Sequence, residues 1–329
     1  MMSDPTKLFR TVTDFTIFDN NLIGHAREVF DDYIEKGIIL SYDFDHHKWE
    51  TTNEYANVTF LFNVNTFQYK RFYQPLFGID YEGFIAYLKS FIVLSMDQHV
   101  LGSLQAFLRD IKRMIKETKR DILLDIEVIK ISSPSLCIDF LASLPYPDDS
   151  EVSQLLEQLD NAMTIVYQNK PKQQRQLAQF QSYFALNDIL ADYWGQALSQ
   201  EQRLFYFPLY LWWKITAVIP LRPREFLLTQ RDCLSEKDGK YFLTLRRNNL
   251  KGKEKSVSHK ISEDYYKTTY EIPKRLAMDI QDYLNLTNSQ SATKLNTLFV
   301  TEPHYKRWER RTGVNNRFLT YTNLNTILK

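Results

Sequence analysis

Glycine and cysteine are scarce in this 329-residue chain, and each shortage argues against a class of protein. With only 9 glycines, the sequence contains neither a Walker-type phosphate loop nor a dinucleotide-binding fingerprint. The two cysteines, Cys137 and Cys233, lie far apart and have no CxxC spacing, so neither a disulfide framework nor a thiolate zinc site is suggested. The N-terminal segment MMSDPTKLFR also lacks the apolar core of a signal peptide, and we expect a cytoplasmic protein.

Only one apolar run approaches the length of a membrane span, at residues 204–221. Prolines and Lys214 interrupt this run. It follows Ser199 and Gln202, whose spacing is that of a capping box, a signature of a helix start. We therefore predict a buried helix here and no association with a membrane.

No excess of one charge marks the chain as a whole, because its formal net charge is +1. This average hides two opposite regions. Residues 1–60 carry 5 basic and 11 acidic side chains, net −6, whereas residues 246–275 carry 9 basic and 4 acidic ones, net +5. Binding to a polyanion depends on such local clusters more than on the total charge. The basic region is therefore a candidate for contact with nucleic acid.

The hydrophobic periodicity predicts a mainly α-helical chain with a small antiparallel sheet, an α+β fold. The length of the chain and the changes in its period indicate three domains. Residues 1–75 form an arm or cap with mixed helix and strand, residues 76–180 a helical domain, and residues 181–329 a domain of helices and the sheet. The elements expected, in chain order, are a helix at 25–40, strands at 38–42 and 58–64, helices at 84–95, 101–115 and 151–167 (the last capped near Ser150), helices starting at Asn187 or Asp188, at Ser199 and after Pro220, strands at 240–247 and 268–272, and a helix at 273–286.

A polar and basic stretch, YQNKPKQQRQ at residues 167–176, separates the second and third domains. It contains a proline and no acidic residue, which is typical of an interdomain linker or an exposed turn. Lys170, Lys172 and Arg175 are candidate phosphate contacts in this stretch. A solvated linker without a ligand is the alternative.

The most informative stretch is IPLRPREFLLTQRD at residues 219–232, followed by a strand, a lysine-rich turn, a second strand and a helix. In this order it resembles the tyrosine recombinase (phage integrase) family. That family has a buried helix, a GLRxxE turn and helix, and then a three-stranded sheet with a lysine in its β-hairpin. The resemblance covers about residues 80–329, with residues 76–180 corresponding to the family's helical core-binding domain, and it is most specific over 199–290. The acidic N-terminal extension resembles that of the large transposon-borne members.

The resemblance implies that Arg222 is the family's first catalytic arginine and Glu225 its structural partner on the same short helix. A planar guanidinium can hold two non-bridging oxygens of one phosphate and stabilises the charge that grows on them during attack. This chemistry needs no metal and no other cofactor. The alternative is that Arg222 only starts a helix and pairs with Glu225 or Asp232. One departure from the family is Pro220, which stands where glycine is usual and which fixes φ and removes a donor.

The family's hairpin lysine protonates the departing 5′ oxygen, and the resemblance assigns this general-acid role to Lys251, with Lys253 as the next candidate. Lys255, Arg246 and Arg247 complete a basic cluster suited to phosphate contacts. A solvated turn without a ligand is the alternative for the lysines.

Family members continue with a His-x-x-Arg box and with a tyrosine that forms a 3′-phosphotyrosyl intermediate. His304–Arg307 has this spacing, but it follows the strand-like segment Thr297–Thr301 closely and lacks an apolar helical continuation, so we interpret the match as coincidental. The nucleophile is expected roughly three helical turns or more beyond such a box, past the last residue, Lys329. We therefore expect this chain to stop within the catalytic domain and to bind DNA without cleaving it.

Taken together, the residues and the resemblance predict a site-specific DNA recombination or integration protein of the bacterial cytosol or nucleoid. Its expected partner is double-stranded DNA, on which it self-associates. The alternative is a non-catalytic helical module that binds DNA or another protein, which the acidic N-terminal region and the near-neutral total charge favour. The sequence Asp45-His46-His47 has no third ligand at a suitable spacing, so we interpret it as a surface turn and expect no bound metal.

We predict that residues 1–329, incubated with a nicked suicide substrate, form no covalent DNA–protein adduct on a denaturing gel. The physical reason is the absence of a tyrosine at the expected distance from the arginine and lysine. An active member of the family, assayed in parallel, provides the positive control. A labelled DNA band that gains the mass of the chain would contradict the prediction.

Overall fold

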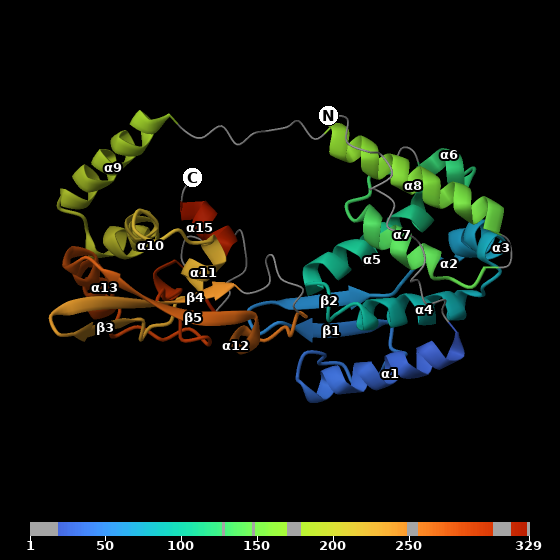
Figure 1. Cartoon of the computed structure of the whole chain (residues 1–329), viewed down its shortest axis with the longest axis horizontal. Helices are drawn as coiled ribbons and strands as arrows, with labels where there is room; N and C mark the ends of the chain where they lie inside the picture. Colours follow the sequence, from blue (N-terminus) through green and yellow to red (C-terminus); the bar gives the residue numbers. More distant parts are fainter. Residues whose placement is uncertain are drawn as a thin grey trace, which may run out of the picture. The chain divides into compact units, whose positions relative to one another are not determined.

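The computed structural model describes residues 19–126, 129–146, 149–169, 179–248, 256–304 and 317–327 (Figure 1). The chain divides into two compact units, Met1–Gln173 with Lys255–Lys260, and Gln174–Glu254 with Ile261–Lys329. The described residues are mainly helical with small antiparallel sheets, so the predicted α+β class is confirmed. The predicted boundary near residue 180 lies close to the division between the units, whereas the one near residue 75 falls inside the first unit.

The first unit combines a set of helices with a β-hairpin (Figure 1). Its first helix begins at Asp19, whose carboxylate accepts a hydrogen bond from the N–H of Leu22 at 2.7 Å. The elements of this unit are α1 (Asn20–Glu35), β1 (Lys48–Thr52), β2 (Asn57–Leu61), α2 (Thr66–Gln68), a π-helical turn (Tyr69–Tyr73), α3 (Gln74–Phe77), α4 (Tyr81–Leu94), α5 (Leu101–Glu117), α6 (Ile122–Ile126), α7 (Pro134–Ala142) and α8 (Asp149–Asn169).

One hydrophobic core joins the hairpin to the helices of the first unit. Trp49 of β1 is fully buried, and its ring lies 4.8 Å from that of Phe30 in α1 and 4.7 Å from that of Phe62 after β2. The same buried cluster continues through α4 and α5 to Leu159 of α8. Because the N-terminal elements bury their apolar side chains in this shared core, residues 19–75 do not pack as a domain of their own.

The segment Ile38–Tyr42 does not form the strand that its apolar residues predicted. The N–H groups of Ile38 and Ile39 both donate to Tyr33 O, at 2.9 and 3.1 Å, and so close the C-terminal end of α1 after Gly37, whose φ is 70°. Ile39 makes an isolated bridge to β1. The strand in this region is β1, which the hydrophobic pattern did not predict because its sequence, KWETT, is mostly polar. The strand β2 lies within the run predicted at residues 58–64 except for its first residue, Asn57.

Helix α5 has the predicted amphipathic pattern, but one buried residue of its stripe is acidic. The apolar residues expected to face the core are all buried: Leu101, Leu104, Leu108, Ile111 and Ile115. Asp110 is 1% exposed, and its carboxylate accepts hydrogen bonds from the N–H groups of Ser132 and Ser133, both at 2.8 Å. Ser133 is the N-cap residue of α7, so this carboxylate joins α5 to the start of α7 and accepts from two N–H groups there.

Among its described residues, the second unit has three helices before a three-stranded sheet, and a long helix follows the last strand of that sheet. The sheet order is β3-β4-β5, antiparallel throughout. The predicted capping box is confirmed, since Ser199 Oγ accepts from Gln202 N at 3.2 Å and Gln202 Oε1 accepts from Ser199 N at 3.1 Å. The elements of this unit are α9 (Phe180–Gly195), α10 (Gln200–Thr216), α11 (Pro223–Leu227), β3 (Leu234–Lys237), β4 (Lys240–Asn248), α12 (Ile261–Asp264), β5 (Tyr265–Ile272), α13 (Lys274–Leu286), a 3₁₀ turn (Glu302–His304) and α15 (Tyr321–Ile327).

The helix start predicted at Asn187 or Asp188 is wrong, because α9 runs through both residues. Asn187 has a different role: its Oδ1 accepts a hydrogen bond from Trp213 Nε1 at 3.2 Å and links α9 to α10. Asn and Asp favour helix starts only when their side chains are free to bond a nearby backbone N–H. Here the side chain of Asn187 is bonded to Trp213 of α10, so it does not cap the start of a helix.

We predict that Asp110→Ala lowers the free energy of unfolding by about 1–3 kcal/mol, because the mutation removes a buried carboxylate that accepts hydrogen bonds from the N–H groups of Ser132 and Ser133 at the start of α7. Urea titration followed by circular dichroism measures the change. Glu117→Ala, an exposed acidic residue two turns further along α5, is the control and is expected to change stability by less than about 0.5 kcal/mol. Equal stability of the two variants would contradict the role given to Asp110.

Candidate functional site

Two prolines and a glutamate set the backbone around Arg222. Pro223 occupies the first turn of α11, a position where its missing N–H costs nothing. A residue before proline is held extended, and Arg222 accordingly has φ −80° and ψ 147°. Its N–H donates to Glu225 Oε2 at 3.0 Å. The short helix predicted after the proline turn is confirmed, and the departure at Pro220 does not prevent the turn.

Glu225 is the centre of the site, because its buried carboxylate contacts two arginines and two backbone N–H groups. The side chain is 3% exposed. One oxygen, Oε1, accepts from Asn248 N at 2.9 Å and lies 3.7 Å from Arg222 Nη1. The other, Oε2, accepts from Arg222 N and lies 3.5 Å from Arg247 Nη1. A carboxylate buried in this way is stabilised by its bonded donors and by the two cations.

Arg246 and Arg247, both on β4, donate hydrogen bonds to backbone carbonyls before and after α11. Arg247 Nη1 donates to Pro220 O at 2.7 Å, and Arg246 Nη1 donates to Leu228 O at 3.1 Å. Leu228 is the C-cap residue of α11, and Pro220 lies in the turn that precedes Arg222. The side chain of Arg222 is 47% exposed, whereas that of Arg247 is 22% exposed. Arg222 is therefore the cation of this cluster most open to a ligand from solution.

The structure brings together Arg222, Glu225 and Arg247, and the pairing of Arg222 with Glu225 was expected. Arg247 and Asn248 N also contact this carboxylate, and the sequence did not predict these two contacts. No local signal could reveal that contact, because Arg247 lies 22 positions after Glu225 and reaches it through the strand turn of β3 and β4. The remaining predicted site residues lie outside the described part of the chain: Lys170, Lys172, Arg175, Lys251, Lys253 and Lys255.

The His-x-x-Arg match begins at a buried residue of the 3₁₀ turn. His304 is 0% exposed, and its ring lies 5.1 Å from that of Phe205 in α10. Its surroundings are those of a core histidine, and the other three residues of the match lie outside the described residues. The strand-like segment Thr297–Thr301 contributes one bridge, Gln230 to Thr297, in place of a strand.

Other candidate reactive groups have ordinary structural surroundings. Arg27 donates a 2.7 Å hydrogen bond to Asp45, which lowers the pKa of that carboxyl, and the adjacent histidines are both exposed in the surface turn predicted there. Burial raises the pKa of the Cys233 thiol to about 12, so it is not a nucleophile at neutral pH. Among the described residues, no set of three or more His, Cys, Asp or Glu side chains is placed to hold a metal ion. Over the same residues, none of the helices combines the length and the apolar character needed to cross a bilayer.

The geometry of the site suits an oxyanion more than a cation or an apolar ligand. Two guanidinium groups lie within 4 Å of one carboxylate, so the three side chains together carry net charge +1. Arginine presents five N–H donors in a planar fork, and the ion pair with Glu225 fixes Arg222 without enclosing it. An anion that reaches Arg222 from solvent meets a cation whose position is already set, which lowers the entropic cost of binding.

Comparisons of the chain with protein family models, with curated proteins and with solved structures found no match.

We predict that Glu225→Gln destabilises the chain by about 2 kcal/mol, because it removes the negative charge between two arginines and places an NH₂ group against backbone donors. Thermal unfolding followed by circular dichroism tests this. Glu236→Gln, on the exposed edge of β3, makes the same chemical change without buried partners and is expected to be neutral. If both variants melt at the temperature of the unmutated chain, Glu225 does not organise the site.

Proposed function

We propose that this chain binds duplex DNA and that its second unit is the phosphate-binding part of a tyrosine recombinase catalytic domain. The observation that carries the proposal is the cluster of Arg222 and Arg247 on the buried carboxylate of Glu225. Arg222 takes the role of the cation that holds the non-bridging oxygens of a phosphodiester. The proposed hairpin lysine, Lys251, follows β4 by three residues, on the same connection that leaves Arg247 and Asn248 at this cluster.

The order of elements supports this proposal. A capped and largely buried helix (α10), the Arg222 turn with α11, a three-stranded antiparallel sheet and a further helix (α13) follow one another as in the family that the sequence resembles. Arg246 and Arg247 on the middle strand brace the Arg222 turn through backbone carbonyls. A fixed turn is what a phosphate-binding arginine needs, because catalysis by electrostatic stabilisation depends on donors that are already in place.

A protein-interaction module is the second candidate, and α9 is the observation that favours it. This helix has no buried residue, and its apolar side chains include Phe180 at 76%, Phe184 at 56% and Ile189 at 62% exposed. Large exposed apolar side chains on one element are typical of a surface that another protein covers. Self-association on DNA, which the sequence predicts, would use such a surface as well. If the chain shows no affinity for duplex DNA at low salt, the interaction module becomes the better description.

We predict that Arg222→Ala leaves the fold intact and weakens binding to duplex DNA by roughly 3- to 10-fold, with the slope of log K against log salt reduced by about 1. Fluorescence anisotropy over a salt series measures both quantities. Arg224→Ala, two positions further along α11 and also exposed, removes the same charge next to the site and is the matched control. Unchanged affinity of Arg222→Ala, or an equal loss in the Arg224 variant, would refute the assignment.

A further inference from the structure

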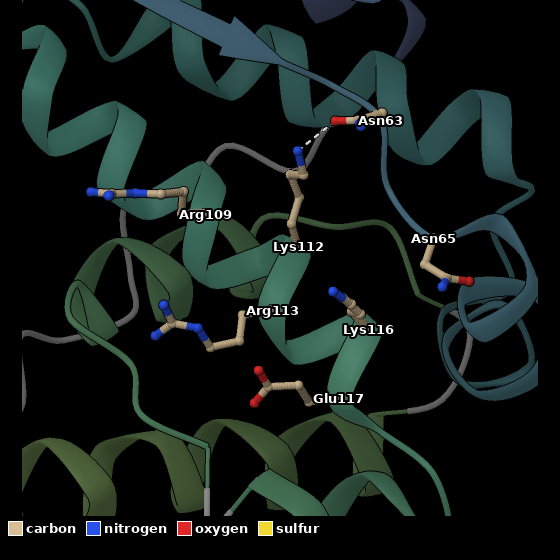
Figure 2. A pocket seen from close by; sticks show the side chains of 7 residues that line it. All are labelled: Asn63, Asn65, Arg109, Lys112, Arg113, Lys116 and Glu117. Atoms are coloured by element: carbon tan, nitrogen blue, oxygen red, sulfur yellow. Dashed lines mark hydrogen bonds between the residues drawn. The ribbon is translucent and has the colours of Figure 1, made fainter.

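The first unit carries a cluster of cations that the sequence analysis did not single out. It lies on α5 at positions i, i+3, i+4 and i+7, the spacing that places side chains on one helix face. We call it the α5 basic face, and it consists of Arg109, Lys112, Arg113 and Lys116. Figure 2 shows these four side chains leaving the same stretch of α5, with the ammonium group of Lys112 directed at Asn63. They line an open pocket of about 440 Å³ together with Asn63, Asn65 and Glu117.

The pocket is rich in hydrogen-bond donors. Asn63 Oδ1 accepts from Lys112 Nζ at 2.5 Å, and Asn65 Oδ1 accepts from Gln68 N at 3.0 Å. An amide whose oxygen is engaged in this way presents its NH₂ group as the remaining polar function. The lining residues comprise four cations and one carboxylate, that of Glu117, for a net charge of +3. Donors and positive charge together suit the oxygens of an anion.

The four cations divide into two that the fold holds and two that it leaves open. Lys112 also donates to Leu61 O at 3.0 Å, and burial lowers its pKa. Arg113 Nη1 donates to Lys130 O at 2.6 Å. Arg109 and Lys116 are exposed, and within the described part of the chain neither has an acceptor on the protein. Arg113 Nη1 also lies 3.8 Å from the buried carboxylate of Asp110, so the fold holds the inner pair, and the outer pair is available to a ligand.

The spacing of the outer pair selects the ligand class. Arg109 and Lys116 are seven residues apart on one helix, about 10 Å along its axis. Side chains at this spacing can contact different phosphates of a polyanion, and duplex DNA places a phosphate on each strand about every 3.4 Å of its axis. The length of the α5 basic face therefore corresponds to about three phosphate intervals of one strand, measured along the duplex axis.

We propose that the α5 basic face is a second DNA-binding site, which holds the phosphodiester backbone of a duplex without reading its sequence. The site belongs to the first unit and uses none of the residues assigned to the arginine cluster of the second unit. Its ligand class rests on the proposed function, while its charge pattern stands independently of it. Contacts of this kind supply affinity and register, and bases elsewhere supply specificity.

The test compares binding of the whole chain and its variants to a fluorescein-labelled duplex of about 30 base pairs, by anisotropy, between about 50 and 300 mM KCl. Arg109→Ala with Lys116→Ala is expected to weaken binding about tenfold or more at the middle of this range and to reduce the salt slope by about 1.8, roughly 0.9 for each phosphate that the variant no longer neutralises. Both side chains are exposed, so the double variant is expected to melt as the unmutated chain does.

The control is Lys36→Ala with Lys48→Ala, which removes two positive charges from the same unit. The side chain of Lys36 is 50% exposed and pairs with Asp32, and that of Lys48 is 40% exposed and pairs with Glu50. Both double variants lose two positive charges, so an effect of total charge alone would weaken the binding of both equally. The proposal expects the control to bind within twofold of the unmutated chain and with the same salt slope. An equal loss in the two double variants would overturn it.

Further arms separate this proposal from the proposed function and from other ligands. If the α5 variant binds DNA normally while Arg222→Ala does not, the α5 site is refuted and the proposed function stands. If the reverse holds, the α5 site stands and the role of Arg222 fails. A poly-glutamate probe whose binding depends on Arg109 and Lys116 as strongly as that of the duplex would overturn the assignment to nucleic acid, as would an unmutated chain without measurable affinity for the duplex.

Discussion

The buried carboxylate of Glu225 is the interaction on which the second unit's site depends. A carboxylate that is 3% exposed must be compensated, and its compensating partners come from two separate elements: Arg222 at the start of α11, and Arg247 with Asn248 N at the end of β4. Burying Glu225 therefore fixes the turn and the strand end against each other. The same arrangement leaves Arg222 half-exposed, so a group that stabilises the fold also prepares a cation for an anionic ligand.

The surrounding elements explain why this geometry holds. The sheet places Arg246 and Arg247 beside the turn, where they donate to Leu228 O and Pro220 O, and Pro223 keeps Arg222 extended. In the first unit, the cationic surface is the α5 basic face, which lies on a single helix. Two of its members, Lys112 and Arg113, donate hydrogen bonds to backbone carbonyls. Both surfaces use fixed cations beside open ones, and for this reason both suit a phosphate backbone more than an apolar ligand.

Much of the fold could be predicted because the signals were local. The capping box at Ser199, the proline turn before α11 and the apolar stripe of α5 are each set by residues within a few positions of one another. Predictions were wrong where a distant partner decided the outcome, as when Tyr33 O took the N–H groups of Ile38 and Ile39, or when Trp213 engaged Asn187. The contact between Arg247 and Glu225 is of the same distant kind, whereas the spacing of the α5 cations was visible in the sequence and was passed over.

The central claim is that Arg222, fixed by Glu225, contacts a DNA phosphate. Modification of arginines by p-hydroxyphenylglyoxal, quantified residue by residue by mass spectrometry with and without duplex DNA, tests it most directly. The account predicts that DNA protects Arg222 strongly, while Arg224 on the same helix reacts at an unchanged rate. Equal reactivity of Arg222 in the presence and absence of saturating DNA would contradict the claim.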